Sequence, residues 1–143
     1  MNRRISEVIE KQKPFTATSS MTVVEAAKLM QQHKVGALMV VDKGRLTGIF
    51  TERDALFRVL AKARDPMTTH IGDVMTSKPR TVTPDKAIGY ALLLMYEGGF
   101  RHVPVVDHGK PIGMVSARDA LGPELQQFES ELSNRDHIST ILG

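Results

Sequence analysis

Two short segments of the sequence place a hydroxyl, an arginine and a carboxylate at the same spacing. They read Thr51-Glu-Arg-Asp54 and Ser116-Ala-Arg-Asp119, and each ends an apolar run and opens a helical pattern. A helix start gathers free backbone N–H groups and the positive end of the helix dipole, so anionic groups bind well there. A carboxylate can accept both hydroxyls of a ribose, and an arginine can face a phosphate with its planar fork. The pattern indicates a site for a phosphorylated ribose in each segment.

The same residues also fit a purely structural role. Thr51 and Ser116 are good N-cap residues, and Asp54 and Asp119 follow three positions later, where a capping box places its acceptor. The repetition in register favours ligand binding. It does not exclude capping, because a duplicated fold also duplicates its caps.

Both segments belong to a long internal repeat. A shift of 65 residues aligns residues 14–56 with residues 79–121 without a gap, and 15 of the 43 positions are identical. Upstream the shift becomes 66, and the extra residue falls within residues 10–13. A period of this length indicates two copies of one supersecondary unit. Half of the chain would struggle to bury a core alone, so we expect the copies to pack together.

Two helices are expected in each copy ahead of its main strands, because apolar residues recur at helical spacing. We expect them at residues 5–9, 22–33, 71–75 and 84–97. The last of these has Thr83 as a candidate N-cap, Pro84 at the first helical position and Asp85 in the positive first turn. In each copy a brief extended segment, at Thr16 or Thr81, lies between the two helices.

A β-hairpin and a final helix complete each copy. The turns Asp42-Lys-Gly44 and Asp107-His-Gly109 each separate two apolar runs. The expected strands are residues 37–41, 46–50, 102–106 and 112–115. The final helices follow Thr51 and Ser116. We expect a helix over residues 123–132 and loose residues after it.

Composition limits the class of protein. The 143 residues are 41% hydrophobic and 24% charged, with no cysteine, which is typical of a globular domain and excludes disulfides and thiolate zinc sites. The five histidines show no metal-binding spacing, and no nucleophile elbow or phosphate-binding glycine loop is present. We therefore expect no metal and no catalysis. The start of the chain lacks a signal-peptide pattern and no apolar run could span a bilayer, so we expect a cytoplasmic protein with no membrane contact.

The formal charge of +3 is unevenly distributed. Residues 123–143 contain four acidic residues and one arginine, which leaves a surplus of six positive charges on the rest of the chain. Such a surplus suits an anionic small molecule as well as nucleic acid. Tryptophan is absent, aromatic residues make up 5% and no Lys/Arg-rich block exists. Nucleic-acid binding is therefore the weaker interpretation.

The order of elements, with Val-Val-Asp-x-Gly in each hairpin and Gly-x-x-Thr/Ser-x-x-Asp at its end, resembles a pair of cystathionine-β-synthase (CBS) domains, or Bateman module. The resemblance covers about residues 5–57 and 71–122. It implies an α+β fold of two CBS-type βαββα repeats with pseudo-twofold symmetry, usually paired again into a flat homodimer. We divide the chain into a first repeat (1–62), a linker (63–70), a second repeat (71–122) and a C-terminal helix and tail (123–143).

The resemblance also implies a regulatory sensor of adenine nucleotides (AMP, ADP or ATP, with NAD as a further ligand) that requires no cofactor for chemistry. The ribose-binding residues would be Asp54, Asp119, Thr51 and Ser116. The phosphate-binding residues would be Arg118, Arg53, Arg101 and His102. The residues bordering adenine would be Thr16, Thr81, Val82 and Ile88.

The two copies differ at the start of the middle strand. Arg101-His102 in the second copy is replaced by Gly36-Ala37 in the first, which removes both donors. Because charge-assisted hydrogen bonds favour a phosphorylated ligand, we expect unequal sites, with the site of Asp119 the stronger.

Three functions follow from these observations. The leading one is a nucleotide-sensing module that acts on a separate, unidentified protein partner. The second is a ligand-free structural dimerisation adaptor whose aspartates only cap helices. The third is a module that binds S-adenosylmethionine or nucleic acid.

Overall fold

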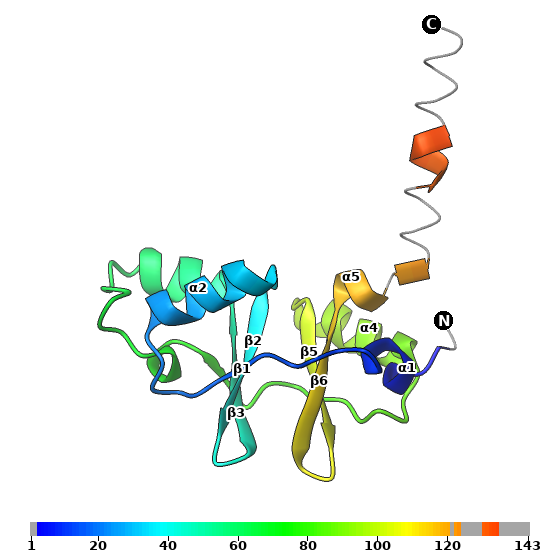
Figure 1. Ribbon diagram of the computed structural model, residues 1–143, viewed down its shortest axis with the longest axis horizontal. Helices are drawn as coiled ribbons and strands as arrows, with labels where there is room; N and C mark the ends of the chain where they lie inside the picture. The colour runs from blue at the N-terminus through cyan, green and yellow to red at the C-terminus, as the bar shows by residue number, and fades with distance from the viewer. Residues whose placement is uncertain (1–2, 121, 124–129, 135–143) are drawn as a thin grey trace, which may run out of the picture.

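The computed structural model describes residues 3–120, 122–123 and 130–134 of the chain. Two similar halves lie side by side, each built around a β-hairpin (Figure 1). Both hairpin turns point to the same side of the molecule, and α2 and α5 lie at the opposite side (Figure 1). The α+β fold of two repeats that the sequence predicted is confirmed.

The elements follow the same order in both halves. The first half contains α1 (Ile5–Ile9), β1 (Thr16–Ala17), α2 (Val23–His33), β2 (Ala37–Asp42), β3 (Arg45–Thr51), α3 (Glu52–Asp54) and the π-helical turn η1 (Ala55–Leu60). The second contains the 3₁₀ turn η2 (Ile71–Asp73), β4 (Thr76–Ser77), α4 (Ile88–Gly98), β5 (His102–Asp107), β6 (Lys110–Ser116) and α5 (Ala117–Ala120).

The hairpins were predicted within a residue or two of their bounds. Each closes through a two-residue loop, Lys43-Gly44 or His108-Gly109, in which both residues have positive φ. That geometry matches the twist of the flanking strands. A register shift falls at the same place in both hairpins, after Val40 and after Val105. The repeat is therefore preserved down to the irregularity of its strands.

Short segments from outside each hairpin extend the sheets. In the first sheet β1 runs parallel to β2, and β4 pairs antiparallel with β3, which gives the order β1-β2-β3-β4. The second sheet contains β5 and β6, and Val82 makes an isolated parallel bridge to Val105. A segment of the second copy, β4, thus completes the sheet of the first.

The short helices that begin the two halves, α1 and η2, are each buried in the core of the other half. Ile5 and Ile9 of α1 are buried with the second half, against α4, β5 and β6. Ile71 and Val74, in and after η2, are buried with the first half. Each half therefore buries a segment that precedes the other half in the sequence.

This exchange corrects the expected start of the long helix at residues 84–97. The helix begins at Ile88, not Pro84, and its N-cap is Ala87 without a side-chain hydrogen bond. The backbone of residues 84–88 instead bonds to the N-terminal segment, with Ser6 N–H donating to Pro84 O at 3.0 Å and Ile88 N–H to Arg3 O at 2.7 Å. The helix expected at residues 71–75 is likewise shorter, as η2.

The residues after the first repeat and after α5 complete the fold. Residues 63–70 lie against the start of α2, where Val23 N–H donates to Thr69 O at 2.9 Å. Of the tail helix expected at residues 123–132, Pro123 and residues 130–132 are helical. Residues 124–129, and the loose residues expected beyond 134, lie outside the described residues. None of the described helices is long and apolar enough to cross a membrane.

Candidate functional site

Two clefts lie between the halves. We call them the Asp54 cleft, with a volume of about 690 Å³, and the Asp119 cleft, with a volume of about 890 Å³. Each takes its name from the carboxylate that opens the helix after a hairpin. The two clefts share four wall residues: Gly36, Glu52, Arg101 and His102.

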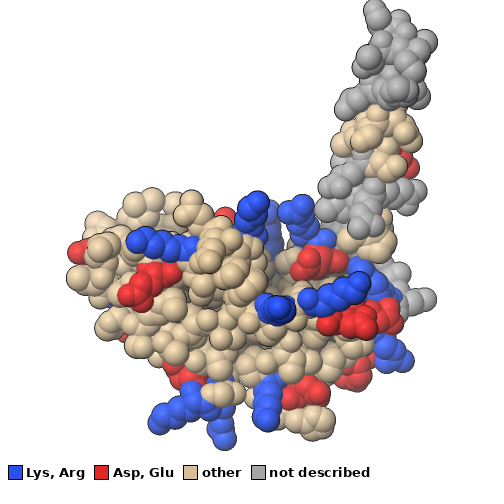
Figure 2. All heavy atoms as spheres, viewed as in Figure 1, with Lys and Arg blue, Asp and Glu red and all other residues tan. Residues whose placement is uncertain are grey.

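Both clefts are strongly basic. The Asp54 cleft has Arg53, Arg58, Lys78, Arg80 and Arg101 against Glu52 and Asp54. The Asp119 cleft has Lys11, Lys13, Lys34, Arg101 and Arg118 against Glu52 and Asp119. Lysine and arginine side chains stand on both sides of the boundary between the halves, near the ends of α2 and α5 (Figure 2). Each cleft thus has more basic than acidic side chains, which favours an anionic ligand there.

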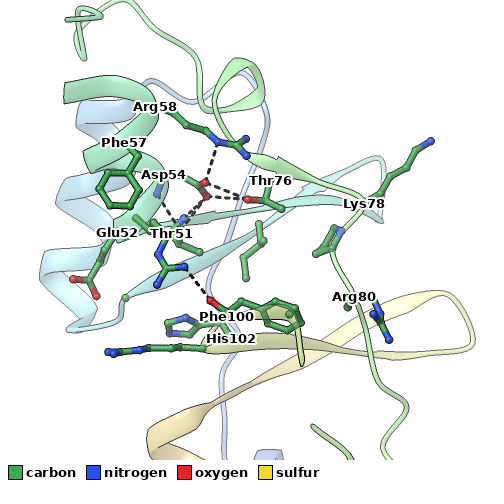
Figure 3. A pocket seen from close by; sticks show the side chains of 17 residues that line it. Thr51, Glu52, Asp54, Phe57, Arg58, Thr76, Lys78, Arg80, Phe100 and His102 are labelled. Atoms are coloured by element: carbon green, nitrogen blue, oxygen red, sulfur yellow. Dashed lines mark hydrogen bonds and ion pairs between the residues drawn. The ribbon is translucent and has the colours of Figure 1, made fainter. Parts of the chain in front are cut away.

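The Asp54 carboxylate is fully engaged in contacts within the protein. Its side chain is buried, with the residue 5% exposed. It accepts hydrogen bonds from the N–H and the hydroxyl of Thr51, at 3.0 and 3.1 Å, and from the hydroxyl of Thr76 at 3.1 Å. Arg58 Nε lies 3.6 Å from the same carboxylate. These side chains converge on one point of the cleft wall (Figure 3).

Asp119 keeps the capping box but is otherwise open. Ser116 Oγ accepts from Asp119 N–H at 3.0 Å, and the Asp119 carboxylate accepts from Ser116 N–H at 3.4 Å. The residue is exposed and lines the Asp119 cleft beside Arg118. Both aspartates therefore cap helices, as the structural interpretation of the sequence required, but Asp54 is nearly buried in its cleft wall whereas Asp119 is exposed.

The expected phosphate-binding residues lie on the cleft walls. Arg101 and His102 line both clefts, and Arg53 and Arg118 line one each. Arg53 is engaged in a bond between the halves, because its guanidinium donates to Gly99 O at 2.9 Å. The sequence assigned Arg101 and His102 to the stronger site at Asp119, whereas the geometry makes them common to the two clefts.

The surroundings of His102 shift the pKa of its imidazole. Burial holds its pKa below the usual range, and the nearby carboxylates of Glu52 and Asp119 oppose this shift while Arg101 adds to it. The imidazole is therefore mainly neutral at pH 7. A Cβ on Gly36 would meet the Glu52 carboxylate and would lie 3.4 Å from the His102 ring. Glycine at this position leaves room for both side chains in the shared wall.

The expected adenine-bordering residues do not line either cleft. Val82 and Ile88 are buried in the core of the second half, because the bridge to Val105 and the start of α4 carry them inward. Thr16 and Thr81 are exposed, and their neighbours Phe15 and Arg80 line the clefts instead. Phe15 also stacks on His33, with ring centroids 3.7 Å apart.

Several cleft residues were missed from the sequence. Thr76, Lys78 and Arg80 reach the Asp54 cleft from the start of the second copy, and Lys11 and Lys13 reach the Asp119 cleft from the N-terminal segment. Only Arg58 carried a local signal, since it follows Asp54 by four residues and so shares a helix face with it. The others come together through the exchange of segments between the halves.

No metal site is visible in the described part of the chain. No group of three or more histidine, cysteine, aspartate or glutamate side chains there is placed to hold an ion.

The chain resembles known proteins over most of its length. Its sequence matches the CBS domain at residues 5–61 and 71–122. It is 40% identical over 120 residues to the mitochondrial CBS domain-containing protein CBSX3 of Arabidopsis thaliana, which covers 80% of this chain and 58% of that protein. It is 34% identical over 124 residues to CBS domain-containing protein YhcV of Bacillus subtilis, which covers 85% and 88%. The chain thus spans less than two thirds of the length of CBSX3.

Solved structures share the fold. A protein with CBS domains from Burkholderia ambifaria superposes with a TM-score of 0.81 at 33% identity, over 86% of this chain and 94% of that one. CBS domain protein PAE2072 of Pyrobaculum aerophilum, complexed with AMP, gives 0.74 at 28% identity, over 81% and 88%. The CBS domain pair of protein MJ0100, in complex with 5′-methylthioadenosine and S-adenosyl-L-methionine, gives 0.73 at 29% identity, over 81% and 94%. The chain belongs to the CBS-domain family and carries two CBS domains in tandem, the arrangement called a Bateman module.

Proposed function

We propose that the chain is a regulatory module that binds an adenine nucleotide in the Asp119 cleft. The observation that carries the proposal is the exposed Asp119 carboxylate, which faces a cleft lined by Arg101, His102 and Arg118. A ribose would donate its hydroxyls to the carboxylate and leave the phosphate to the cations. The ligands of PAE2072 and MJ0100 all contain adenosine, which supports the same sugar and base here.

The charge of the cleft favours a phosphorylated ligand over S-adenosylmethionine. Five lysines and arginines line it against two carboxylates. Such a wall attracts AMP, ADP, ATP or the pyrophosphate of NAD, and it repels the sulfonium cation of S-adenosylmethionine. We therefore rank the nucleotides above S-adenosylmethionine as ligands of this chain.

The proposed role is regulatory and not enzymatic. The cations, hydroxyls and carboxylates that line the clefts suit the holding of a nucleotide, and the hydroxyls of Thr51 and Thr76 beside the Asp54 carboxylate belong to a buried helix cap. A bound nucleotide would act through different affinities for two arrangements of the halves or of a dimer, because only such a difference shifts a population. The output would pass to a separate protein partner, and the cytoplasm stays our expected location.

We propose in addition that the module pairs with a second copy. Leu56, Phe57 and Leu60 on η1 are exposed, and so are Tyr90, Leu93 and Tyr96 on α4. Large apolar side chains gathered on two helices are typical of a protein–protein contact. A homodimer formed through these faces would bury them, and it leaves both clefts on the boundary between the halves.

Titration calorimetry tests the ligand and the site. AMP should bind the wild type, and Asp119→Ala should weaken it by about tenfold to a hundredfold, since hydrogen bonds to a charged group contribute about 1.5–3 kcal/mol. Asp73→Ala, which removes an exposed carboxylate from η2, is the matched control and should bind AMP as the wild type does.

Two results would contradict the proposal. Equal AMP affinity in wild type and Asp119→Ala would move the ribose site away from Asp119. The absence of any stability gain with millimolar AMP, ATP, NAD or S-adenosylmethionine would favour the structural adaptor instead, because a ligand at 100 times its Kd adds about 2.7 kcal/mol.

A further inference from the structure

The two aspartates that cap the post-hairpin helices differ in what their carboxylates can still accept. Asp54 is buried and each of its oxygens already has a partner: Thr51 at Oδ2, Thr76 and Arg58 at Oδ1. Asp119 is exposed, and its carboxylate has one long bond, to Ser116 N–H at 3.4 Å. We call Thr51, Asp54, Arg58 and Thr76 the Asp54 network.

A ribose needs the acceptor positions that the Asp54 network fills. A carboxylate offers about four lone-pair sites. Here the Thr51 N–H, the Thr51 hydroxyl and the Thr76 hydroxyl donate hydrogen bonds to them, and Arg58 Nε lies 3.6 Å from Oδ1 as an ion pair. Two ribose hydroxyls could bond to Asp54 only if they displaced Thr76 and Arg58. The hydrogen bonds that the ribose forms with Asp54 would then be offset by the loss of the Thr76 hydrogen bond and of the Arg58 ion pair, which the buried Asp54 carboxylate already makes.

The network is anchored on both sides, so its donors are not free to swing away. Arg58 also donates to Met75 O at 2.7 Å, which ties η1 to the segment just before β4. Thr76 is fixed by β4, whose pairing with β3 sets it opposite Ile49. The repeat does not reproduce these donors at Asp119. Pro123 follows Asp119 by four residues as Arg58 follows Asp54, and the position equivalent to Thr76 falls on Glu10 or Lys11, where the shift changes from 66 to 65. Among the described residues the Asp119 carboxylate bonds to Ser116 and to none of these.

We propose that Arg58 and Thr76 are specificity-determining residues that exclude ribose from the Asp54 cleft, so that each chain binds one adenine nucleotide, at Asp119. This inference rests on the proposed function. It also replaces the sequence-based reason for unequal sites, because Arg101 and His102 line both clefts while the Asp54 network is found in one.

The stoichiometry of AMP binding, measured by titration calorimetry on the full chain, tests the inference. We expect one AMP per wild-type chain and binding that is weaker by about tenfold to a hundredfold on Asp119→Ala. Adding R58M and T76V to Asp119→Ala should restore one AMP, at the released Asp54, with a gain in affinity of roughly 10- to 100-fold over Asp119→Ala alone. R58M keeps the apolar stem of the side chain and T76V keeps its shape, so both spare the packing.

A matched control variant is available, and the possible outcomes separate this inference from the proposed function. R64M and T68V, two exposed positions outside both clefts, make the same chemical changes and should restore no binding to Asp119→Ala. Two AMP molecules on the wild-type chain would overturn the inference and leave the proposed function standing. No AMP on the released Asp119→Ala variant, with its melting curve intact, would also overturn the inference. No AMP on the wild type would overturn the proposed function itself. If the released variant does not fold, T76V alone in the same background and the wild-type stoichiometry still decide.

Discussion

His102 lies in the wall that the two clefts share, half-buried between the carboxylates of Glu52 and Asp119 and next to Arg101. Arg53 on α3 and Arg118 on α5 line the same clefts. Burial lowers the pKa of His102, so the free protein carries little charge there at pH 7. A phosphate placed beside the ring would favour the imidazolium and raise its pKa. Binding should therefore take up a proton.

The pH dependence follows with a definite sign. We expect AMP affinity to rise as the pH falls from 8 to 6.5, by up to about tenfold per pH unit. The measurement is calorimetry in two buffers of different ionisation enthalpy, which reports the proton uptake. His102→Ala should lose this uptake, whereas His108→Asn, in the exposed hairpin turn, should keep it. The same pH slope in His102→Ala as in the wild type would show that another group takes up the proton.

The free protein should show the opposite trend in stability. Because the pKa of His102 is lower in the folded chain than in the unfolded chain, the unfolded state binds more protons below pH 6.5. The contribution of neutral His102 to the free energy of unfolding is thus complete above pH 6.5 and is lost as the pH falls below it. Urea denaturation at pH 7.5 and 5.5 should reveal the loss, and His102→Ala should reduce it.

Replacement of the two capping aspartates should destabilise the protein to different extents, because Asp54 makes more contacts than Asp119. Asp54→Ala removes a buried carboxylate and leaves Thr51, Thr76 and Arg58 without their acceptor, which should cost about 2–4 kcal/mol of unfolding free energy. Asp119→Ala removes an exposed cap and should cost about 1 kcal/mol or less. Denaturant titration of both variants checks the order, and equal losses would contradict it.

At the scale of elements, the exchange of leading helices decides which core each segment stabilises. Ile5 of α1 is fully buried among residues of the second half, including Val103 and Val115. Its backbone N–H donates to Lys86 O, just before α4. The short N-terminal helix is therefore a structural part of the half that is farther from it in the sequence.

Truncating Ile5 should weaken the second half before the first. Ile5→Ala should lower the unfolding free energy by about 2–4 kcal/mol, because it leaves a cavity in a closed core. Hydrogen exchange should accelerate in β5 and β6 more than in β2 and β3. Glu7→Ala, on the exposed face of α1, is the control and should change neither. Faster exchange confined to β2 and β3 would contradict the assignment of α1 to the second core.

The local elements of this fold could be predicted from the sequence, but its long-range contacts could not. Apolar runs and turn residues predicted the hairpins, and the residue spacing predicted both capping boxes, which Thr51 and Ser116 form. The predicted start of α4 was wrong because backbone hydrogen bonds with residues 3–6 fix residues 84–88 outside the helix. No local propensity encodes such a contact. Thr76 and Lys78 at the Asp54 cleft were missed for the same reason, since β4 reaches that cleft by pairing with β3.

At the scale of the whole molecule, two helix faces stay uncovered. Tyr96 on α4 is 88% exposed, and Leu60 on η1 is 72% exposed. In a single chain this apolar surface contacts water, which costs about 25 cal/mol for each Å² that pairing would bury. A second copy of the chain offers the same faces and can bury both in a symmetric contact.

Charge placed on these faces should separate the pair. We expect light scattering after size-exclusion chromatography to give the mass of two chains for the wild type and of one chain for Leu60→Glu with Leu93→Glu. Arg45→Glu, on the exposed end of β3, changes charge away from these faces and should leave the mass unchanged. A wild type with the mass of one chain would count against the dimer.

The exchange of α1 and η2 also bears on how such a chain could arise by duplication. A chain with one copy of the repeat would carry a leading helical turn but would have no second core to receive it, and its own core would lack the equivalent of Ile71 and Val74. Two such chains could complete each other by trading these turns. The present molecule has the same reciprocal arrangement within one chain. Residues 63–70 connect the two units here, and the clefts where the nucleotide is proposed to bind lie where two single-repeat chains would meet if they paired in this way.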